Sequence, residues 1–184
     1  NLTVGGTGKT PLLLTIITQF IAGGYRPGVI SRGYGGHTDQ YPCLLDADSS
    51  AAEVGDEPLL YANLCPVVVD PDRVRAAKFL LENNSCDVIF SDDGLQHYAL
   101  DRDVELVVID GERGFGNGYC LPAGPLREPP ERMAEADMVV INGDLQVDID
   151  QYTHQPYSMS VEPLLFRKLN TGETLVPEQW SAGR

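Results

Sequence analysis

Apolar residues recur at helical spacing between residues 11 and 22. The set comprises Leu12, Leu13, Ile16, Ile17, Phe20 and Ile21. This spacing predicts a buried helix that ends at Gly23 and Gly24. A glycine-rich stretch, residues 5–10, precedes it, and residues 1–4 read as the end of a strand that runs into that stretch.

Further along the chain, short apolar runs alternate with helical segments. We expect strands at residues 29–31, 67–70, 87–90, 104–109 and 138–141, and helices at 51–64, 73–82 and 132–136. Valine- and isoleucine-rich strands that alternate with helices predict an α/β fold, with a mostly parallel sheet flanked by helices. Residues 164–184 predict short strand pieces around a turn at 170–172. We therefore assign one domain to residues 1–160 and the start of a C-terminal part to 161–184.

The charge balance of the 184 residues is strongly acidic. Thirteen Lys and Arg face 27 Asp and Glu, a formal net charge of -14. Such a field repels nucleic acid, so we expect no nucleic-acid partner. Any bound polyanion is expected to be held by a local feature such as a glycine-rich loop, a cation or a metal.

The chain has four cysteines, Cys43, Cys65, Cys86 and Cys120, which lie far apart in the sequence. This spacing predicts reduced thiols.

Two features concern the ends of the chain and membranes. No apolar stretch approaches the roughly 18 residues of a membrane helix, so we expect a soluble chain. The opening residues are unusual for a natural start, and the last ones close no obvious core. We expect further segments before residue 1 and after residue 184.

The strongest chemical signal is a phosphate-binding loop. It lies after the expected strand and before the first helix, the context that this motif requires. The expected nucleotide-binding residues are Thr3, Val4, Gly5, Gly6, Thr7, Gly8, Lys9 and Thr10. Glycines let backbone N–H groups face a phosphate, Lys9 bridges phosphate oxygens and Thr10 offers a hydroxyl to Mg²⁺. Thr3 stands where the strict pattern has its first glycine. The loop indicates a P-loop NTPase-like fold.

Adjacent carboxylates follow the strand expected at residues 87–90. Asp92 and Asp93 are costly side by side unless a cation lies between them, so with Thr10 they are the candidate metal ligands. The alternative is a solvated acidic turn. Asp110, also at a strand end, ranks second.

Five segments together resemble a known family. In chain order they are residues 3–11 (TVGGTGKTP), 31–35 (SRGYG), 55–58 (GDEP), 92–97 (DDGLQH) and 121–129 (LPAGPLREP). They look like tetraacyldisaccharide 4′-kinase of lipid A synthesis, over residue 1 to about residue 143.

The resemblance implies ATP with Mg²⁺, an acylated disaccharide 1-phosphate as acceptor, and a place on the cytoplasmic face of the bacterial inner membrane, reached through segments outside this chain. It implies that Asp56 accepts the proton of the sugar 4′-hydroxyl, with Asp92 and Asp93 organising the metal. From the residues alone, Asp56 is equally the N-cap of a helix with Pro58 in its first turn.

Other polar residues of these segments are further candidates. Lys9 and Arg127 are expected to act in catalysis; Gln96 and His97 contact the nucleotide, and Tyr34, Glu57, Arg127 and Glu128 contact the substrate. An exposed loop or a surface ion pair would equally explain several of them.

Two other functions compete with the kinase. A nucleotide-switch GTPase would use the same loop, but residues 142–144 (NGD) lack the lysine of a guanine-reading segment. The other is an inactive nucleotide-binding fragment.

Overall fold

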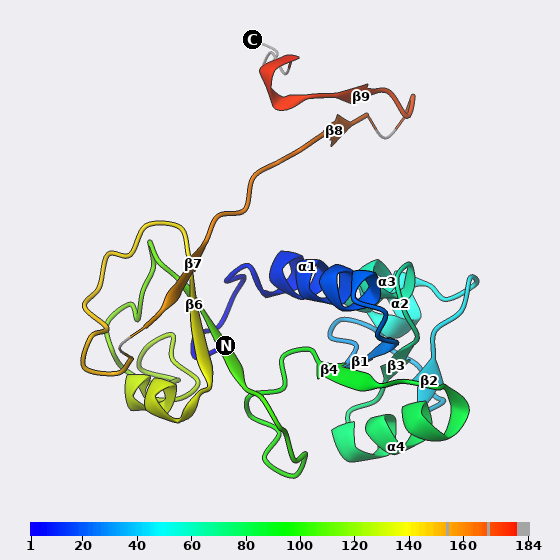
Figure 1. Ribbon diagram of the computed structural model, residues 1–184, viewed down its shortest axis with the longest axis horizontal. Coiled ribbons are helices and arrows are strands. Elements are labelled where there is room, and N and C mark those ends of the chain that lie inside the picture. Colours follow the sequence, from blue (N-terminus) through cyan, green and yellow to red (C-terminus); the bar gives the residue numbers. More distant parts are fainter. Residues whose placement is uncertain (154, 169, 180–184) are drawn as a thin grey trace.

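The computed structural model describes residues 1–153, 155–168 and 170–179. Its helices are α1 (Lys9–Ala22), α2 (Ala51–Val54), α3 (Asp56–Ala62), α4 (Arg73–Asn83) and the 3-10 helices η1 (Pro130–Glu135) and η2 (Pro177–Gln179). Its strands are β1 (Pro27–Ser31), β2 (Cys43–Leu44), β3 (Val67–Val69), β4 (Val88–Ser91), β5 (Leu106–Asp110), β6 (Met138–Asn142), β7 (Tyr157–Met159), β8 (Phe166–Arg167) and β9 (Thr174–Leu175). The expected mostly parallel α/β fold is confirmed (Figure 1).

The first sheet has the strand order β2-β3-β1-β4. Strands β3 and β4 both pair in parallel with β1, and the short β2, which the sequence pattern did not predict, pairs antiparallel with β3. The carboxyl ends of β1 and β4 therefore meet at one edge, where ligands bind in folds of this kind.

Helices cover both faces of this sheet, as expected. Adjacent residues of β1 point in opposite directions. Val29 packs in a cluster with Ile17 of α1 and Tyr61 of α3, whereas Ile30 packs with Leu80 of α4. Figure 1 shows α1 and α3 on one side of the strands and α4 on the other. Each fully buried apolar side chain contributes about 1.5–3 kcal/mol to this packing.

The second sheet is β5-β6-β7, parallel throughout. It has its own core, in which Val107 and Ile141 pack with Met133 of η1 and with Leu2 and Leu95 from outside the sheet. Strand β7 was not predicted. Leu2, near the start of the chain, and Leu95, just after β4, thus pack in the second core. The two chain segments that carry these residues link the first sheet to the second.

The strands form two main sheets where one was expected, because no pairing joins β4 to β5. The strand expected at residues 1–4 is reduced to a bridge between Thr3 and Leu126. The backbone there forms hydrogen bonds with the proline-rich segment, residues 121–129. Val4 N–H donates to Pro125 O at 3.0 Å, and Arg127 N–H donates to Leu2 O at 2.6 Å. The proline-rich segment occupies the hydrogen-bonding edge that a sheet strand would use.

The single helix expected over residues 51–64 is wrong. Gly55 breaks it into α2 and α3, with φ 85° and ψ 162°, a conformation that only glycine adopts readily. The break turns Asp56 into the first residue of a new helix.

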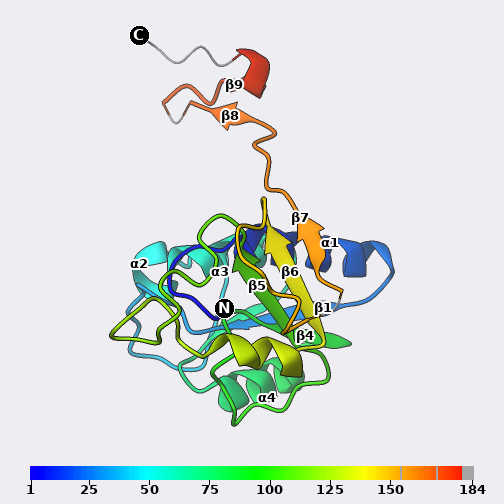
Figure 2. The same cartoon turned by 90° about the vertical axis from the view of Figure 1, so that its left-hand side faces the viewer.

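The C-terminal residues leave the rest of the molecule. Strands β8 and β9 pair antiparallel around residues 170–172, as expected, and both views show this hairpin projecting away from the two sheets (Figures 1 and 2). Residues 180–184 of the predicted C-terminal part lie outside the described residues. Within the part of the chain that the structure describes, every helix is too short or too polar to cross a membrane.

Candidate nucleotide and phosphoryl-transfer site

The phosphate loop lies between the two cores and runs into α1. Gly5 and Gly8 have φ of 94° and 90°, so the backbone curls where a side chain would be strained. Helix α1 begins at Lys9, two residues before the expected start, so its free N–H groups open onto the loop. The second sheet supports the curl, because Asn142 Nδ2 donates to Thr7 O at 3.3 Å.

A neighbouring arginine holds the other side of the loop. Arg113 donates from Nη2 to Gly6 O and from Nε to Asp110 Oδ2, the latter at 2.7 Å. Asp110 is therefore already paired with a cation, which weakens its candidacy as a metal ligand.

Three of the predicted site residues form one charged cluster. Lys9 Nζ lies 3.2 Å from Asp93 Oδ1, and Arg127 Nη1 lies 2.7 Å from Asp93 Oδ2. Burial by itself would raise the pKa of Asp93, but the Arg127 hydrogen bond and the Lys9 charge hold it at about 2. The carboxylate is thus ionised, and it orients two cations that both border the phosphate loop.

Asp92 lies in a different environment from its neighbour. It is 4% exposed, and burial, followed by the charge of Glu57, raises its pKa to about 6. Glu57 in turn accepts a hydrogen bond from Thr10 Oγ1 at 2.8 Å. The acidic groups beside the Thr10 hydroxyl fit a cation, whereas Asp93 is taken up by Lys9 and Arg127.

No three His, Cys, Asp or Glu side chains gather as a preformed metal site among the described residues. Magnesium characteristically uses one or two protein carboxylates and completes its shell with phosphate oxygens and water. A hydroxyl, a buried carboxylate and a phosphate loop therefore match the chemistry of Mg²⁺ held together with a nucleotide.

Asp56 is exposed at the start of α3, where its Oδ1 accepts the Glu57 N–H at 3.0 Å. The N-cap interpretation is off by one residue, because Gly55 is the N-cap and Asp56 the first helical residue. The glycine-rich loop after β1 packs directly on this turn: a Cβ on Gly55 would lie 2.6 Å from Tyr34 O. The Tyr34 side chain itself is 85% exposed.

The residues after the paired aspartates are also near the cluster. Gln96 Oε1 accepts from Arg127 Nη1 at 3.3 Å, and its Nε2 donates to Glu128 Oε1 at 2.5 Å. Tyr98 donates to the second oxygen of Glu128 at 2.6 Å. Both Glu128 oxygens are thus bonded within the protein, which favours a supporting role, and its contact with substrate stays a prediction. Burial, then the charge of a nearby arginine, lowers the pKa of His97.

Two buried residues that the sequence pattern missed complete the site. Arg73, the first residue of α4, donates to Asp70 O and to Asp92 O, each at 3.0 Å, and so ties together the ends of β3 and β4. Tyr61 is fully buried, and its hydroxyl lies beside the Thr10 and Asp92 side chains. Burial and the charge of Asp92 raise the Tyr61 pKa. Helical periodicity assigns such side chains to packing and carries no signal for this role.

A cavity of about 450 Å³ lies at the carboxyl ends of β6 and β7. It is lined by Ile141, Gly143, Asp144, Leu145, Pro156, Ser158, Met159 and Ser160. The phosphate loop borders this region, since a Cβ on Gly8 would lie 2.6 Å from Met159 Cε and 2.7 Å from Asn142 Nδ2. The volume suits a small ligand.

Comparisons with known proteins show the family to which the chain belongs. The family model described as tetraacyldisaccharide-1-P 4′-kinase matches residues 1–181. Proteins named tetraacyldisaccharide 4′-kinase from Alkalilimnicola ehrlichii, Hahella chejuensis and Stutzerimonas stutzeri are 61%, 51% and 47% identical to this chain, over 78%, 94% and 100% of its length. The matches cover 44%, 50% and 54% of those relatives, so the chain spans about half the length of the curated relatives it matches.

A solved structure shows the same fold. It is LpxK from Aquifex aeolicus, described as an apo form in complex with ATP, with a TM-score of 0.71 and 30% sequence identity. The match covers 91% of this chain and 52% of that one.

Proposed function

The chain belongs to the tetraacyldisaccharide-1-P 4′-kinase family, and on that premise we propose that it is the ATP-binding part of a kinase that phosphorylates the 4′-hydroxyl of an acylated glucosamine disaccharide 1-phosphate. The observation that carries the proposal is the cluster of Lys9, Asp93 and Arg127 at a phosphate loop that opens a helix. Two oriented cations beside a phosphate loop would stabilise the charge that develops on a transferring phosphoryl group, which supports the proposal.

In this proposal the phosphates of ATP lie in the curl of residues 5–10. Lys9 and Arg127 hold the same carboxylate, so we place both against the γ-phosphate. The 450 Å³ cavity beside Gly8 takes the base, at the point where Asn142 joins β6 to the phosphate loop. Asp144 in its lining supplies a carboxylate that can accept a hydrogen bond from the adenine amino group.

Thr10 and Asp92 are the residues that would hold Mg²⁺, with Glu57 beside them. When bound, the ion neutralises charge on the phosphate oxygens. Glu57 orients the Thr10 hydroxyl through their 2.8 Å hydrogen bond. Arg73 keeps Asp92 in place by donating a hydrogen bond to the backbone carbonyl of Asp92.

The transfer needs an in-line acceptor more than covalent help from the protein. The 4′-oxygen forms a bond to the γ-phosphorus, the bond from that phosphorus to the β,γ-bridging oxygen breaks, and ADP leaves. Asp56 takes the hydroxyl proton, a role that its exposed carboxylate at the start of α3 permits. Tyr34 lies on the loop that packs against the turn before Asp56, so we assign it to the acceptor.

The acyl chains of such an acceptor lie in a membrane, so the proposed place of action is the cytoplasmic face of the bacterial inner membrane. Segments of the longer relatives that this chain does not cover would make the membrane contact and complete the acceptor site.

Calorimetric titration of this chain with Mg-ATP and Mg-GTP tests the nucleotide step. Mg-ATP should bind more tightly than Mg-GTP, and Lys9→Ala should lower the ATP affinity by about tenfold or more, since a charge-assisted contact is lost. A preference for GTP would contradict the kinase and favour a nucleotide switch.

In a full-length kinase that contains this chain, Asp56→Asn should abolish phosphate transfer to the lipid disaccharide and leave ATP affinity unchanged.

A further inference from the structure

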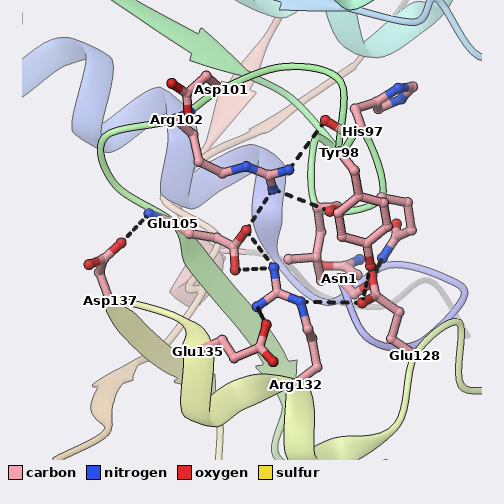
Figure 3. Close-up of polar contacts among 12 residues, drawn as sticks. Asn1, His97, Tyr98, Asp101, Arg102, Glu105, Glu128, Arg132, Glu135 and Asp137 are labelled. Atoms are coloured by element: carbon pink, nitrogen blue, oxygen red, sulfur yellow. Dashed lines mark hydrogen bonds and ion pairs between the residues drawn. The ribbon is translucent and has the colours of Figure 1, made fainter.

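A buried polar network lies beside the proposed site (Figure 3). Glu105, 9% exposed, directly precedes β5. Arg132 of η1 donates from Nη2 to Glu105 Oε2 at 2.8 Å and lies 2.7 Å from Oε1. Arg102 donates to Glu105 Oε2 at 2.6 Å and to the carbonyls of Leu95 and His97, each at 3.2 Å. The network therefore connects η1 to the loop that carries the paired aspartates.

The same network reaches the charged cluster at the phosphate loop. Arg132 Nε lies 3.3 Å from Glu128 Oε2. Glu128 accepts from Gln96, and Gln96 accepts from Arg127, which holds Asp93. An unbroken series of polar contacts thus runs from η1 to the carboxylate that orients the phosphate-facing cations.

This series costs free energy to build, because its charged groups are largely removed from water. Arg132 is 12% exposed in its side chain. Ion pairs buried in this way are weak evidence for stability, and their best attested use is to fix one geometry. Among the described residues, Arg132 is the only cation that forms an ion pair with Glu128, so its loss would leave that carboxylate with hydrogen bonds from Gln96 and Tyr98 but without a counter-charge. Pro129 and Pro130 stiffen the link from this loop to η1.

We propose that Arg132, held by the buried Glu105, is a positioning residue that fixes Glu128 and Gln96 and thereby aims the Arg127 guanidinium at the γ-phosphate. The inference rests on the proposed function, in which Arg127 faces that phosphate. It adds η1, outside the five family segments, to the parts of the chain that determine how ATP is held.

The test measures Mg-ATP and Mg-ADP affinity by calorimetry, well below the unfolding temperature. Arg132→Met, which keeps an unbranched apolar stem but removes the guanidinium, should weaken ATP binding about tenfold, and ADP binding less than about twofold. Arg132→Lys should restore part of the ATP affinity. In an Arg127→Ala background, Arg132→Met should have no further effect, since its target is gone.

Glu135→Gln is the matched control. Glu135 is a third partner of Arg132, at 3.4 Å, but it is largely exposed and has no other ion pair or side-chain hydrogen bond among the described residues, so its change should leave the ratio of ATP to ADP affinity unaltered. If Arg132→Met weakens ATP and ADP equally, or leaves both unchanged while Arg127→Ala weakens ATP, the positioning role is wrong. If Arg127→Ala itself leaves ATP binding unchanged, the proposed role of Arg127 fails first. Should Arg132→Met not fold, Glu105→Gln serves the same comparison.

Discussion

At the scale of single residues, two adjacent aspartates have opposite electrostatic environments. Asp93 is held ionised by Lys9 and Arg127, whereas burial and the charge of Glu57 raise the pKa of Asp92. Neighbouring groups whose pKa values are shifted in opposite directions are typical of sites where charge is arranged for a ligand. The ionised form of Asp92 therefore costs stability in the free protein.

This cost predicts that, without Mg²⁺ or nucleotide, Asp92→Asn raises the free energy of unfolding by an amount that depends on pH. Below about pH 4 the carboxyl is protonated in both states; between about 4 and 6 mainly the unfolded state ionises, so the carboxyl contributes less to stability as pH rises. At pH 7.5 the variant should therefore be more stable by about 1–3 kcal/mol, and at pH 5 by about half as much. Urea unfolding at both pH values measures this, with the exposed Asp39→Asn as control. An equal loss of stability at both values would contradict it.

Gly8 offers a second prediction at this scale. A Cβ there would meet Met159 and Asn142 at under 3 Å, whereas one on Gly24, at a similar φ of 85°, would meet nothing within 4 Å. Gly24→Ala should cost only the backbone strain, about 1–2 kcal/mol. Gly8→Ala should cost more in urea unfolding and lower ATP affinity at least about tenfold. Equal effects of the two substitutions on unfolding and binding would show that the close approach at Gly8 is unimportant.

At the scale of elements, the helices place the site residues by their first turns. α1 begins with Lys9, α3 with Asp56 and α4 with Arg73. Side chains and backbone N–H groups of a first turn point beyond the helix end, so three such ends gather polar groups at one place. The starts of α1, α3 and α4 are therefore part of the candidate site.

The start of α4 is fixed by its cap, because Asp72 Oδ1 accepts the Arg75 N–H at 3.0 Å. Asp72→Ala should lower the free energy of unfolding by about 1 kcal/mol, as expected for a lost N-cap. Asp72→Asn keeps the acceptor and should cost far less. Urea unfolding measures the stability of both variants. An alanine variant as stable as the asparagine variant would show that the Asp72 cap does not stabilise α4.

At the scale of the whole molecule, the phosphate loop lies between two cores. Leu2 packs with β5 and β6, while Ile17 of α1 packs with β1 and β3, so the loop joins the two sheets through the chain itself. Asn142 adds a contact from β6 to the loop. A ligand held by the loop should therefore stabilise both sheets together.

Mg-ATP at one hundred times its dissociation constant should raise the free energy of unfolding by about 2.7 kcal/mol. Hydrogen exchange should slow in β1 and β4 and also in β5 and β6, because both sheets contact the loop. The hairpin of β8 and β9, which projects away, should serve as the internal reference and remain unchanged. Protection confined to β1 and β4 would show that the second sheet does not take part in binding.

The sequence by itself determined the α/β class, the phosphate loop and the family. These rest on local signals: apolar runs with the period of helix or strand, and glycines where the backbone must curl. It also identified Lys9, Asp93 and Arg127, whose segments the structure brings into contact.

Only the tertiary structure decided how these segments combine. The split into two main sheets and the break at Gly55 depend on which hydrogen-bonding edges and packing positions remain free after the chain has folded back on itself. The different environments of Asp92 and Asp93 depend on burial, and the roles of Arg73 and Arg132 depend on partners far away in the sequence. Burial and long-range pairing are properties of the folded chain, because no local pattern records which residue comes to lie beside another.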